Sequence, residues 1–264
     1  MQEGLETRRP RNIYVIKLGG SIITYKNKPF TPNVDLIKRI GNEIADLAVK
    51  DIGVGIVIGG GSYGHYAVAI EKENNADARD MIHVVSNAML ELALLVSDIL
   101  ASSGVLTTIF PPHAMCMPRN LNPNCDWRHA LRAFQKGITP LTYGDIYPCD
   151  NGEGWCIVSG DELAMELACS LGASKVIYVT DVDGILDDEG RVIETLSLND
   201  IRDIYVSASG STAIDVTGGI KRKLAAIHEN WCSNIQEVWI INGHREGSLR
   251  ALAEGRTYGT RITP

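Results

Sequence analysis

Lysines and glycines recur in this sequence in a pattern suited to binding phosphate groups. In the stretch 15–21, Lys17 closes an apolar run and Gly19, Gly20 and Ser21 follow it. A glycine turn after a strand exposes backbone N–H groups to an anion, and an adjacent ammonium group neutralises the charge. A glycine turn alone is more often only a turn. This stretch therefore suggests a phosphate site, and later segments must support it.

A second glycine turn, at 59–65, ends in Gly64 and His65. Its spacing also matches the dinucleotide-binding fingerprint, but that fold needs a second strand ending in an acidic residue about 20 positions on. A charged stretch at 71–80 stands there instead. The Walker A pattern fails because His65 stands where lysine is required. We expect Gly60 and Gly61 to let a substrate phosphate approach bare backbone, with His65 donating a hydrogen bond; a structural role for His65 stays open.

The second half of the chain contains three further turns with glycines and charged or polar side chains. Ser159, Gly160 and Asp161 open a helical pattern at 162–171, and an apolar run at 175–180 leads into an acidic turn. The acidic turn resembles a calcium loop only superficially, because its glycine is misplaced. A ribose or base contact, or a plain turn, is expected there. The third segment is a glycine pair that opens a helix carrying a lysine on its first turn, which suits a second phosphate site. The acidic turn contains Thr180, Asp181, Asp183 and Gly184, and the third segment contains Gly218, Gly219 and Lys223.

Alternating strand and helix patterns must position these turns. Apolar runs at 12–18 and 53–58 read as strands, and the stretch 33–50 between them has helical spacing. Two parallel strands joined by a helix predict a right-handed α/β sheet. The helical stretch 81–100 is apolar on nearly all sides, which favours a buried helix or a subunit interface, or a surface lining a hydrocarbon pocket. The stretch 111–124 reads as a loop, and a hairpin tip at 151–154 indicates a lobe boundary.

Composition excludes several classes of protein. The 264 residues are 45% hydrophobic, enough for one large domain or two joined lobes. A net charge of −7 argues against a general nucleic-acid binder. The six cysteines have irregular spacings and no C-x-x-C pair, so we expect reduced thiols and neither a zinc cluster nor a disulfide framework. No secretory signal is expected, and no apolar run reaches the roughly 18 residues of a membrane span without polar interruption. We expect a cytoplasmic protein that binds no membrane.

Seven motifs in register resemble the amino acid kinase superfamily. They are Lys17-Leu18-Gly19-Gly20-Ser21, Gly59-Gly60-Gly61-Ser62-Tyr63-Gly64-His65, Tyr143-Gly144-Asp145, Ser159-Gly160-Asp161, Thr180-Asp181-Val182-Asp183-Gly184, Asp215-Val216-Thr217-Gly218-Gly219 and Gly259-Thr260-Arg261-Ile262-Thr263. The resemblance runs from about residue 12 to the end and looks most like the isopentenyl phosphate kinases, with fosfomycin kinases as near relatives. It implies a three-layer αβα sandwich with an open, mainly parallel sheet. It also implies a homodimer, a short extension at 1–11, an acceptor-binding lobe at 12–150 and a nucleotide-binding lobe at 151–264.

The resemblance implies a role for each matching residue. Lys17 would contact the transferring phosphoryl group, Lys26 would stabilise the transition state, and Asp161 would orient the lysines. Together with His65, these are the expected catalytic residues. Gly60, His65 and Gly160 would hold the phosphate of the acceptor. The positions implied on the ATP side are Lys17, Gly19, Gly20, Ser21, Gly61, Thr180, Asp181, Asp183, Gly184, Gly218 and Lys223. Mg²⁺ would bridge the ATP phosphates, and no residue is assigned to it as a ligand.

One loop departs from the family pattern. The acceptor-loop sequence Ser-Pro-Ser-Ala-Phe is replaced here by Pro111-Pro112-His113-Ala114-Met115-Cys116, whose end is closer to fosfomycin kinases. The intact Ser159-Gly160-Asp161 motif and the apolar stretch 81–100 favour a five-carbon alkenyl phosphate as the acceptor. Two other classes remain as alternatives: a nucleotide- or oxyanion-binding protein without catalysis, which the retained lysines disfavour, and a dinucleotide-dependent oxidoreductase, which the missing fingerprint strand disfavours.

Overall fold

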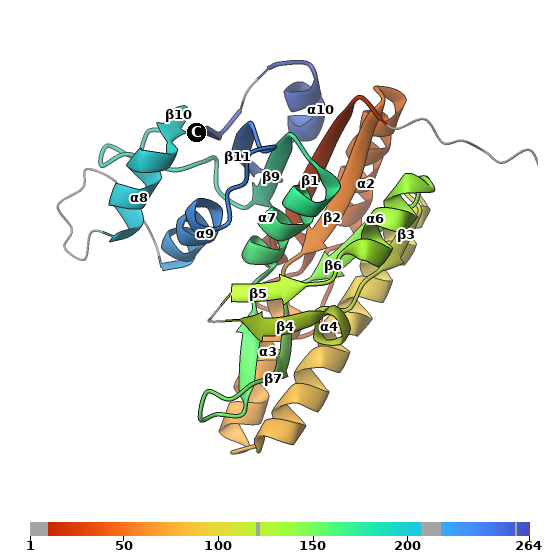
Figure 1. Cartoon of the computed structure of the whole chain (residues 1–264), viewed down its shortest axis with the longest axis vertical. Coiled ribbons are helices and arrows are strands. Elements are labelled where there is room, and N and C mark those ends of the chain that lie inside the picture. The colour runs from red at the N-terminus through yellow and green to blue at the C-terminus, as the bar shows by residue number, and fades with distance from the viewer. Residues whose placement is uncertain (1–9, 120–121, 207–217, 257) are drawn as a thin grey trace, which may run out of the picture.

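A computed structural model of the chain describes residues 10–119, 122–206, 218–256 and 258–264. Its centre is an eight-stranded sheet in the order β10-β12-β11-β9-β1-β2-β6-β3, in which every neighbouring pair is parallel except β11 and β12 (Figure 1). The strands are β1 (Asn12–Leu18), β2 (Ile52–Ile58), β3 (Thr107–Ile109), β6 (Thr139–Tyr143), β9 (Lys175–Thr180), β10 (Thr195–Ser197), β11 (Glu237–Asn242) and β12 (Thr260–Thr263).

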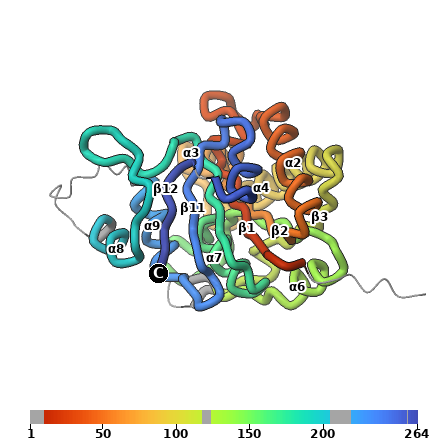
Figure 2. Tube along the Cα trace, turned by 90° about the horizontal axis from the view of Figure 1, so that it is seen from above, coloured from red at the N-terminus to blue at the C-terminus, as the bar shows by residue number. Residues whose placement is uncertain are grey.

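Helices cover both faces of this sheet, as Figure 2 shows from above. One face carries α1 (Gly20–Ile23), α2 (Val34–Val49), α3 (Gly61–Glu73), α4 (Ala78–Ala101) and α10 (Ser248–Ala253). The other face carries α6 (Arg128–Gln135), α7 (Gly160–Leu171), α8 (Leu198–Val206) and α9 (Gly218–Glu229). Two hydrophobic cores result, one on each side of the sheet. The predicted three-layer αβα sandwich is confirmed.

Strand β1 shows how the sequence builds both cores. Successive side chains of a strand point to opposite faces, so Tyr14, Ile16 and Leu18 enter the core beneath α2, while Ile13 and Val15 enter the core beneath α7. Burial on both faces explains why this strand reads as a continuous apolar run. Lys17 belongs to the same alternation and therefore points toward the α7 side.

Local signals fix the helices that frame the edge of the sheet. Asn33 caps α2 by accepting a hydrogen bond from the N–H of Leu36 at 3.3 Å. Ser159 caps α7 in a capping box with Glu162, and Gly172 ends that helix in the left-handed conformation at φ 71°. Such caps satisfy N–H and C=O groups that the ends of a helix leave without partners. The helical stretches predicted at 33–50 and 162–171 are confirmed, and these caps place the observed helix starts at Val34 and Gly160.

The stretch 111–124 differs from the predicted loop. It contains α5 (Pro112–Met115) and the antiparallel pair β4 (Cys116–Arg119) and β5 (Asn122–Cys125). A second hairpin, β7 (Asp145–Pro148) with β8 (Trp155–Val158), has the expected tip between its strands. Both hairpins lie outside the main sheet. Their cysteines explain why two-stranded pieces of this size hold together, since an isolated hairpin is only marginally stable in water.

The expectation of reduced thiols is wrong. All six cysteines lie within the described residues and form three disulfides, joining Cys116 to Cys125, Cys149 to Cys156, and Cys169 to Cys232. The first two staple the hairpins, and the third joins the end of α7 to the segment after α9. Their spacings looked irregular because hairpin register and helix packing, not local sequence, bring the sulfur atoms together.

The helix predicted at 81–100 is present as α4, but it differs in one respect from the expectation that no apolar run is long enough to span a membrane. By length and composition it is the one helix among the described residues that could cross a membrane, although core helices of other proteins pass the same test. Here α4 packs against α2, α3, β3, β6 and β7. Its inward residues belong to the core beneath α2, namely Met81, Val85, Ala88, Met89, Leu92, Ala93, Val96 and Leu100. One side of α4 thus packs into the core, while only 33% of its apolar window is buried. The absence of a membrane partner stays a prediction.

Candidate active site

Glycine turns at the carboxyl edge of the sheet are joined to one another by backbone hydrogen bonds. Each glycine that follows a strand donates its N–H to a carbonyl at the end of the neighbouring strand. The four bonds run from Gly19 to Val179 (2.8 Å), from Gly59 to Leu18 (2.9 Å), from Gly144 to Ile58 (3.0 Å) and from Gly243 to Thr180 (2.7 Å). Turns far apart in the sequence therefore form one row, at the edge where open α/β sheets bind ligands.

Close backbone approach makes glycine necessary in this row. A Cβ on Gly20 would lie 2.2 Å from the backbone nitrogen of Gly61, and Gly61 itself has φ +49°. A Cβ on Gly59 would lie 3.5 Å from Nζ of Lys17, and one on Gly160 would lie 3.5 Å from Cε of Lys17. The lysine thus rests against the bare backbone of two different turns, as an anion-binding site requires.

One buried carboxylate holds two of the predicted lysines. Oδ1 of Asp161 lies 2.7 Å from Nζ of Lys17 and 2.8 Å from Nζ of Lys223. Burial raises the pKa of Asp161, but the charges of both lysines and their hydrogen bonds outweigh it and keep the pKa well below its usual range. Burial and the nearby charge of Lys17 lower the pKa of Lys223 to about 8, although Asp161 opposes the shift. This cluster combines one negative and two positive groups and suits a dense polyanion.

An aromatic ring that the sequence interpretation did not single out completes this cluster. Nζ of Lys223 lies 4.5 Å from the centre of the Tyr178 ring, within cation–π range. The hydroxyl of Tyr178 donates to the backbone carbonyl of Asp161 at 2.9 Å. Tyr178 lies on β9 next to Lys17 in the register of β1 and β9. Nothing in a continuous apolar strand distinguishes such a tyrosine from an ordinary core residue, so only the fold reveals it.

Lys26 lies with Ser21 and Asp181 at the neighbouring turn. Its Nζ contacts Oδ2 of Asp181 at 2.6 Å, and the hydroxyl of Ser21 donates to Oδ1 of the same carboxylate at 3.0 Å. The Lys26 side chain is 69% exposed, so it can leave this ion pair at little cost. The structure therefore brings Ser21, Lys26 and Asp181 together at the carboxyl ends of β1 and β9.

His65 lies farther out, exposed on α3. Among the described residues it has no hydrogen-bond partner. Helix α3 nevertheless reaches the Lys26 loop, because the hydroxyl of Tyr66 donates to the carbonyl of Lys26 at 3.3 Å, and the N–H of Ser62 donates to Thr24 Oγ1 at 2.8 Å. Gly60, the cap residue of α3, lies in the turn between Gly59 and Gly61.

The remaining predicted residues lie at the turn that follows β9 and at the start of α9. Asn242 donates to Asp183 at 2.9 Å, and Thr180 Oγ1 accepts from the N–H of Val182 at 3.1 Å. A Cβ on Gly184 would lie 2.7 Å from the hydroxyl of Thr260, so the C-terminal motif packs on this turn. Gly218 begins α9, while the motif residues 215–217 lie outside the described part of the chain.

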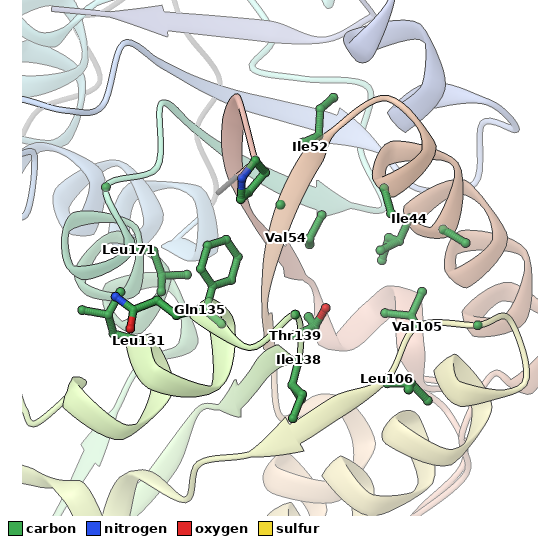
Figure 3. Close-up of a pocket in the computed structure, with 18 of the residues that line it drawn as sticks. Ile44, Ile52, Val54, Val105, Leu106, Leu131, Gln135, Ile138, Thr139 and Leu171 are labelled. Carbon is green, nitrogen blue, oxygen red and sulfur yellow. The ribbon is translucent and has the colours of Figure 1, made fainter. Parts of the chain in front are cut away.

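Two features of the described residues bear on what the site could bind. No group of three or more His, Cys, Asp or Glu side chains there could hold a metal ion, and Asp161 and Asp181 are paired with lysines. The described side chains therefore offer no ready-made metal cage at this edge of the sheet. A cavity of about 840 Å³ lies instead at the amino ends of β2 and β6, and none of the predicted site residues line it (Figure 3).

Comparisons with known proteins agree with this geometry. The family model for the amino acid kinase family matches residues 12–242. The chain is 29% identical to the isopentenyl phosphate kinase of Methanocaldococcus jannaschii, over 94% of this chain and 97% of that protein. It is 30% identical to the enzyme of that name from Methanothermobacter thermautotrophicus, over 94% and 98%. The crystal structure of the T. acidophilum isopentenyl phosphate kinase product complex has the same fold, with a TM-score of 0.74, 24% identity and coverage of 95% and 100%.

Proposed function

Because the chain belongs to the amino acid kinase family, we propose that it phosphorylates isopentenyl phosphate with ATP, giving isopentenyl diphosphate and ADP. The class of reaction follows from the family: the protein is an ATP-dependent phosphotransferase. The named acceptor is that of relatives aligned over nearly their whole length. The observation that carries the proposal is the buried cluster of Lys17, Asp161 and Lys223 beside bare glycine backbone.

The reaction needs little covalent chemistry from the protein. A phosphate oxygen of the acceptor attacks the γ-phosphorus of ATP, an O–P bond forms, and the bond from that phosphorus to ADP breaks with its electron pair leaving on ADP. The attacking oxygen is already anionic, so no strong general base is required. Catalysis then rests on bringing two anions together and neutralising them, which is the task that Lys17, Lys223 and the glycine N–H groups are suited to.

Asp161 would set the positions of both lysines before substrate arrives. A carboxylate that accepts hydrogen bonds from two ammonium groups fixes them at distances of 2.7 and 2.8 Å. Phosphate oxygens entering the site would take up the remaining N–H groups of each lysine, since an ammonium group has three donors. Mg²⁺, when bound to ATP, would supply further neutralisation of the β- and γ-phosphates.

A panel of acceptors assayed with ATP and Mg²⁺ tests the proposal. Isopentenyl phosphate should be phosphorylated with the highest kcat/KM. Fosfomycin is the second candidate, because Ala114, Met115 and Cys116 resemble the acceptor loop of fosfomycin kinases. Efficient transfer to fosfomycin with none to isopentenyl phosphate would overturn the named acceptor. ATP binding without transfer to any acceptor would favour a non-catalytic binding protein. We also propose a cytoplasmic homodimer, although three disulfides inside cells are typical only of hyperthermophiles.

Lys26→Ala should chiefly lower kcat. The exposed ammonium group can leave Asp181 and contact the phosphoryl group during its transfer. Loss of one such donor costs roughly 10²-fold in kcat. The KM values for both substrates should change much less. Steady-state kinetics of the variant measure both quantities, with Lys28→Ala in the same loop as the matched control. Unchanged turnover in Lys26→Ala would contradict the assignment.

Activity should fall in alkaline solution because of Lys223. Its pKa is lowered to about 8 by burial and by Lys17, so the free enzyme loses this positive charge above that pH. The value of kcat/KM for ATP should therefore drop about tenfold per pH unit beyond it. Global stability should not fall with it: a lysine whose pKa is lower in the folded state than in the unfolded state adds stability as pH rises between about 8 and 10.5.

Lys223→Arg provides the control for this prediction. Arginine stays protonated throughout the range, so the alkaline decline in kcat/KM should disappear or move to higher pH in the variant. An alkaline limb that is identical in both proteins would assign the titration to another group.

A further inference from the structure

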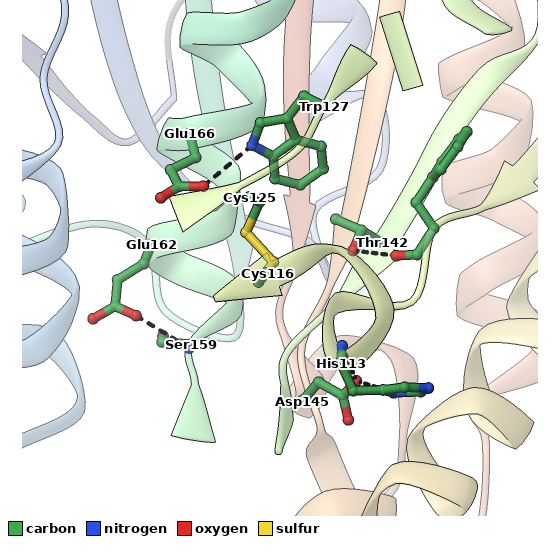
Figure 4. Close-up of a disulfide and its surroundings, with 10 residues drawn as sticks. His113, Cys116, Cys125, Trp127, Thr142, Asp145, Ser159, Glu162 and Glu166 are labelled. Atoms are coloured by element: carbon green, nitrogen blue, oxygen red, sulfur yellow. Dashed lines mark hydrogen bonds and ion pairs between the residues drawn. A yellow bond between two sulfur atoms is a disulfide. The ribbon is translucent and has the colours of Figure 1, made fainter. Parts of the chain in front are cut away.

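A histidine and an aspartate form a hydrogen-bonded pair at the carboxyl end of β6 (Figure 4). Nδ1 of His113 lies 2.7 Å from Oδ2 of Asp145, and the backbone N–H of His113 donates to the same oxygen at 3.2 Å. The N–H of Ile146 donates to Oδ1 at 2.8 Å. The Asp145 side chain is fully buried, while that of His113 is 35% exposed. Burial raises the pKa of Asp145, and these hydrogen bonds oppose the shift.

The carboxylate determines which ring nitrogen faces outward. Nδ1 carries the proton directed at Asp145, which leaves Nε2 as the free nitrogen of the ring. Figure 4 shows this distal nitrogen directed away from Asp145, and among the described residues it has no hydrogen-bond partner. His113 thus presents Nε2 from a fixed position. Because Nδ1 faces Asp145, Nε2 can donate a hydrogen bond only when both ring nitrogens carry a proton.

Asp145, the partner of His113, is joined to the glycine row through the residue before it. Asp145 directly follows Gly144, and a Cβ on Gly144 would lie 3.0 Å from the backbone nitrogen of Gly160. Gly160 in turn lies against Lys17. On the other side, β7 packs against α4 and places Ile146 in the apolar core. Asp145 therefore lies between the glycine row on one side and the apolar core at α4 on the other.

The loop that carries His113 is held from both sides. Helix α5 is entered through Pro111 and Pro112 and ends at Cys116, whose disulfide to Cys125 is drawn in Figure 4. The N–H of Asp126 also donates to the carbonyl of Met115 at 2.9 Å. A loop fixed in this way loses little further freedom when a ligand binds, and preorganisation of this kind favours a binding role.

We propose that His113 is an acceptor-binding residue, whose Nε2–H donates a hydrogen bond to a non-transferring oxygen of the acceptor's phosphate. Asp145 is the positioning residue that orients the ring. This inference rests on the proposed function and adds a contact to it. In the family pattern from which this loop departs, a serine stands where this chain has His113. An imidazole that carries a proton on both nitrogens gives a stronger hydrogen bond to a phosphate than a neutral hydroxyl group does.

Two substitutions separate the proposed contact from a structural role. In His113→Asn the amide nitrogen can replace Nδ1 and keep the bond to Asp145, but nothing replaces Nε2. In His113→Gln the amide extends to about the place of Nε2 and the bond to Asp145 is lost. We expect His113→Asn to raise the acceptor KM about tenfold or more, with the KM for ATP changed less than twofold. His113→Gln should retain more acceptor affinity than His113→Asn. The reverse order, or an unchanged acceptor KM in both, would overturn the proposal.

Direct binding gives an independent readout, with His129→Asn as the control because His129 is exposed on α6. In NMR spectra of protein labelled with ¹⁵N-histidine, the Nε2 signal of His113 is identified as the one that is missing from His113→Gln. Isopentenyl phosphate added without ATP should shift this signal and leave the His129 signal in place. Failure of the wild-type protein to bind or phosphorylate isopentenyl phosphate would overturn the proposed function. The His113 variants would then be compared on the acceptor of the panel that does react. If none reacts or binds, both proposals fail.

Discussion

Replacing Lys17 by methionine is expected to lower kcat by about 10³-fold, the upper range for loss of a preorganised donor to a developing charge. The lysine lies at the end of the central strand, is only 8% exposed, and rests against the backbone of Gly59 and Gly160. Lys223 is held by the same oxygen, Oδ1 of Asp161, so it is not free to take the place of Lys17. Methionine fills a similar volume and removes the charge, so the loss should lie in the chemical step.

Rapid-quench measurement of a single turnover would check this directly. The matched control is Lys50→Met, which removes an exposed lysine at the end of α2 that pairs with Glu254 at 3.0 Å. Circular dichroism should show both variants folded. A Lys17→Met protein that keeps more than a tenth of the wild-type rate would mean that the lysine is not at the reacting phosphate.

Breaking the disulfide between Cys169 and Cys232 should destabilise the protein by roughly 4 kcal/mol, the chain-entropy value for a loop of this length. The two cysteines are 63 residues apart, so the cross-link removes much conformational freedom from the unfolded chain. In a protein of this size the loss should lower Tm by roughly 10 °C. Thermal unfolding of the double variant Cys169→Ser, Cys232→Ser measures it.

The hairpin disulfide provides the comparison for this experiment. Cys149 and Cys156 are only 7 residues apart, and the same reasoning gives a smaller contribution of roughly 2.5 kcal/mol for so short a loop. The double serine variant of this pair should therefore unfold at a higher temperature than that of the long-range pair. If the oxidised wild-type protein and the Cys169→Ser, Cys232→Ser variant unfold at the same Tm, this cross-link does not stabilise the fold.

The fold could be predicted from the sequence because its signals are local. Apolar strands end in glycine turns, and helix caps such as Asn33 and Ser159 stand directly before the periodic stretches that they begin. The carboxyl edge of a parallel sheet then collects those turns whatever the details of packing. For this reason Lys17, Asp161 and Lys223 could be assigned to one site before their contacts were known.

The pairings across the fold could not be predicted in the same way. Lys17 and Lys223 share the carboxylate of Asp161 because of the way α7 and α9 pack on the sheet, and local sequence does not show this packing. The bond between His113 and Asp145 joins residues 32 positions apart. The disulfides follow from hairpin register and helix packing, although cysteines 9 and 7 positions apart on either side of a turn were a signal for the two hairpin bonds.

The contact between the turns that contain Gly20 and Gly61 has a consequence for how this protein can evolve. The two backbones lie so close that even a methyl group at Gly20 would require one turn to move. One of these turns follows Lys17 and the other begins α3. Related sequences can thus diverge in the outer loops, such as the one around α5, while this crossing point tolerates almost no variation. If the proposed function holds, new substrate specificities would arise by changes in the outer loops, while the contact between the turns of Gly20 and Gly61 stays unchanged.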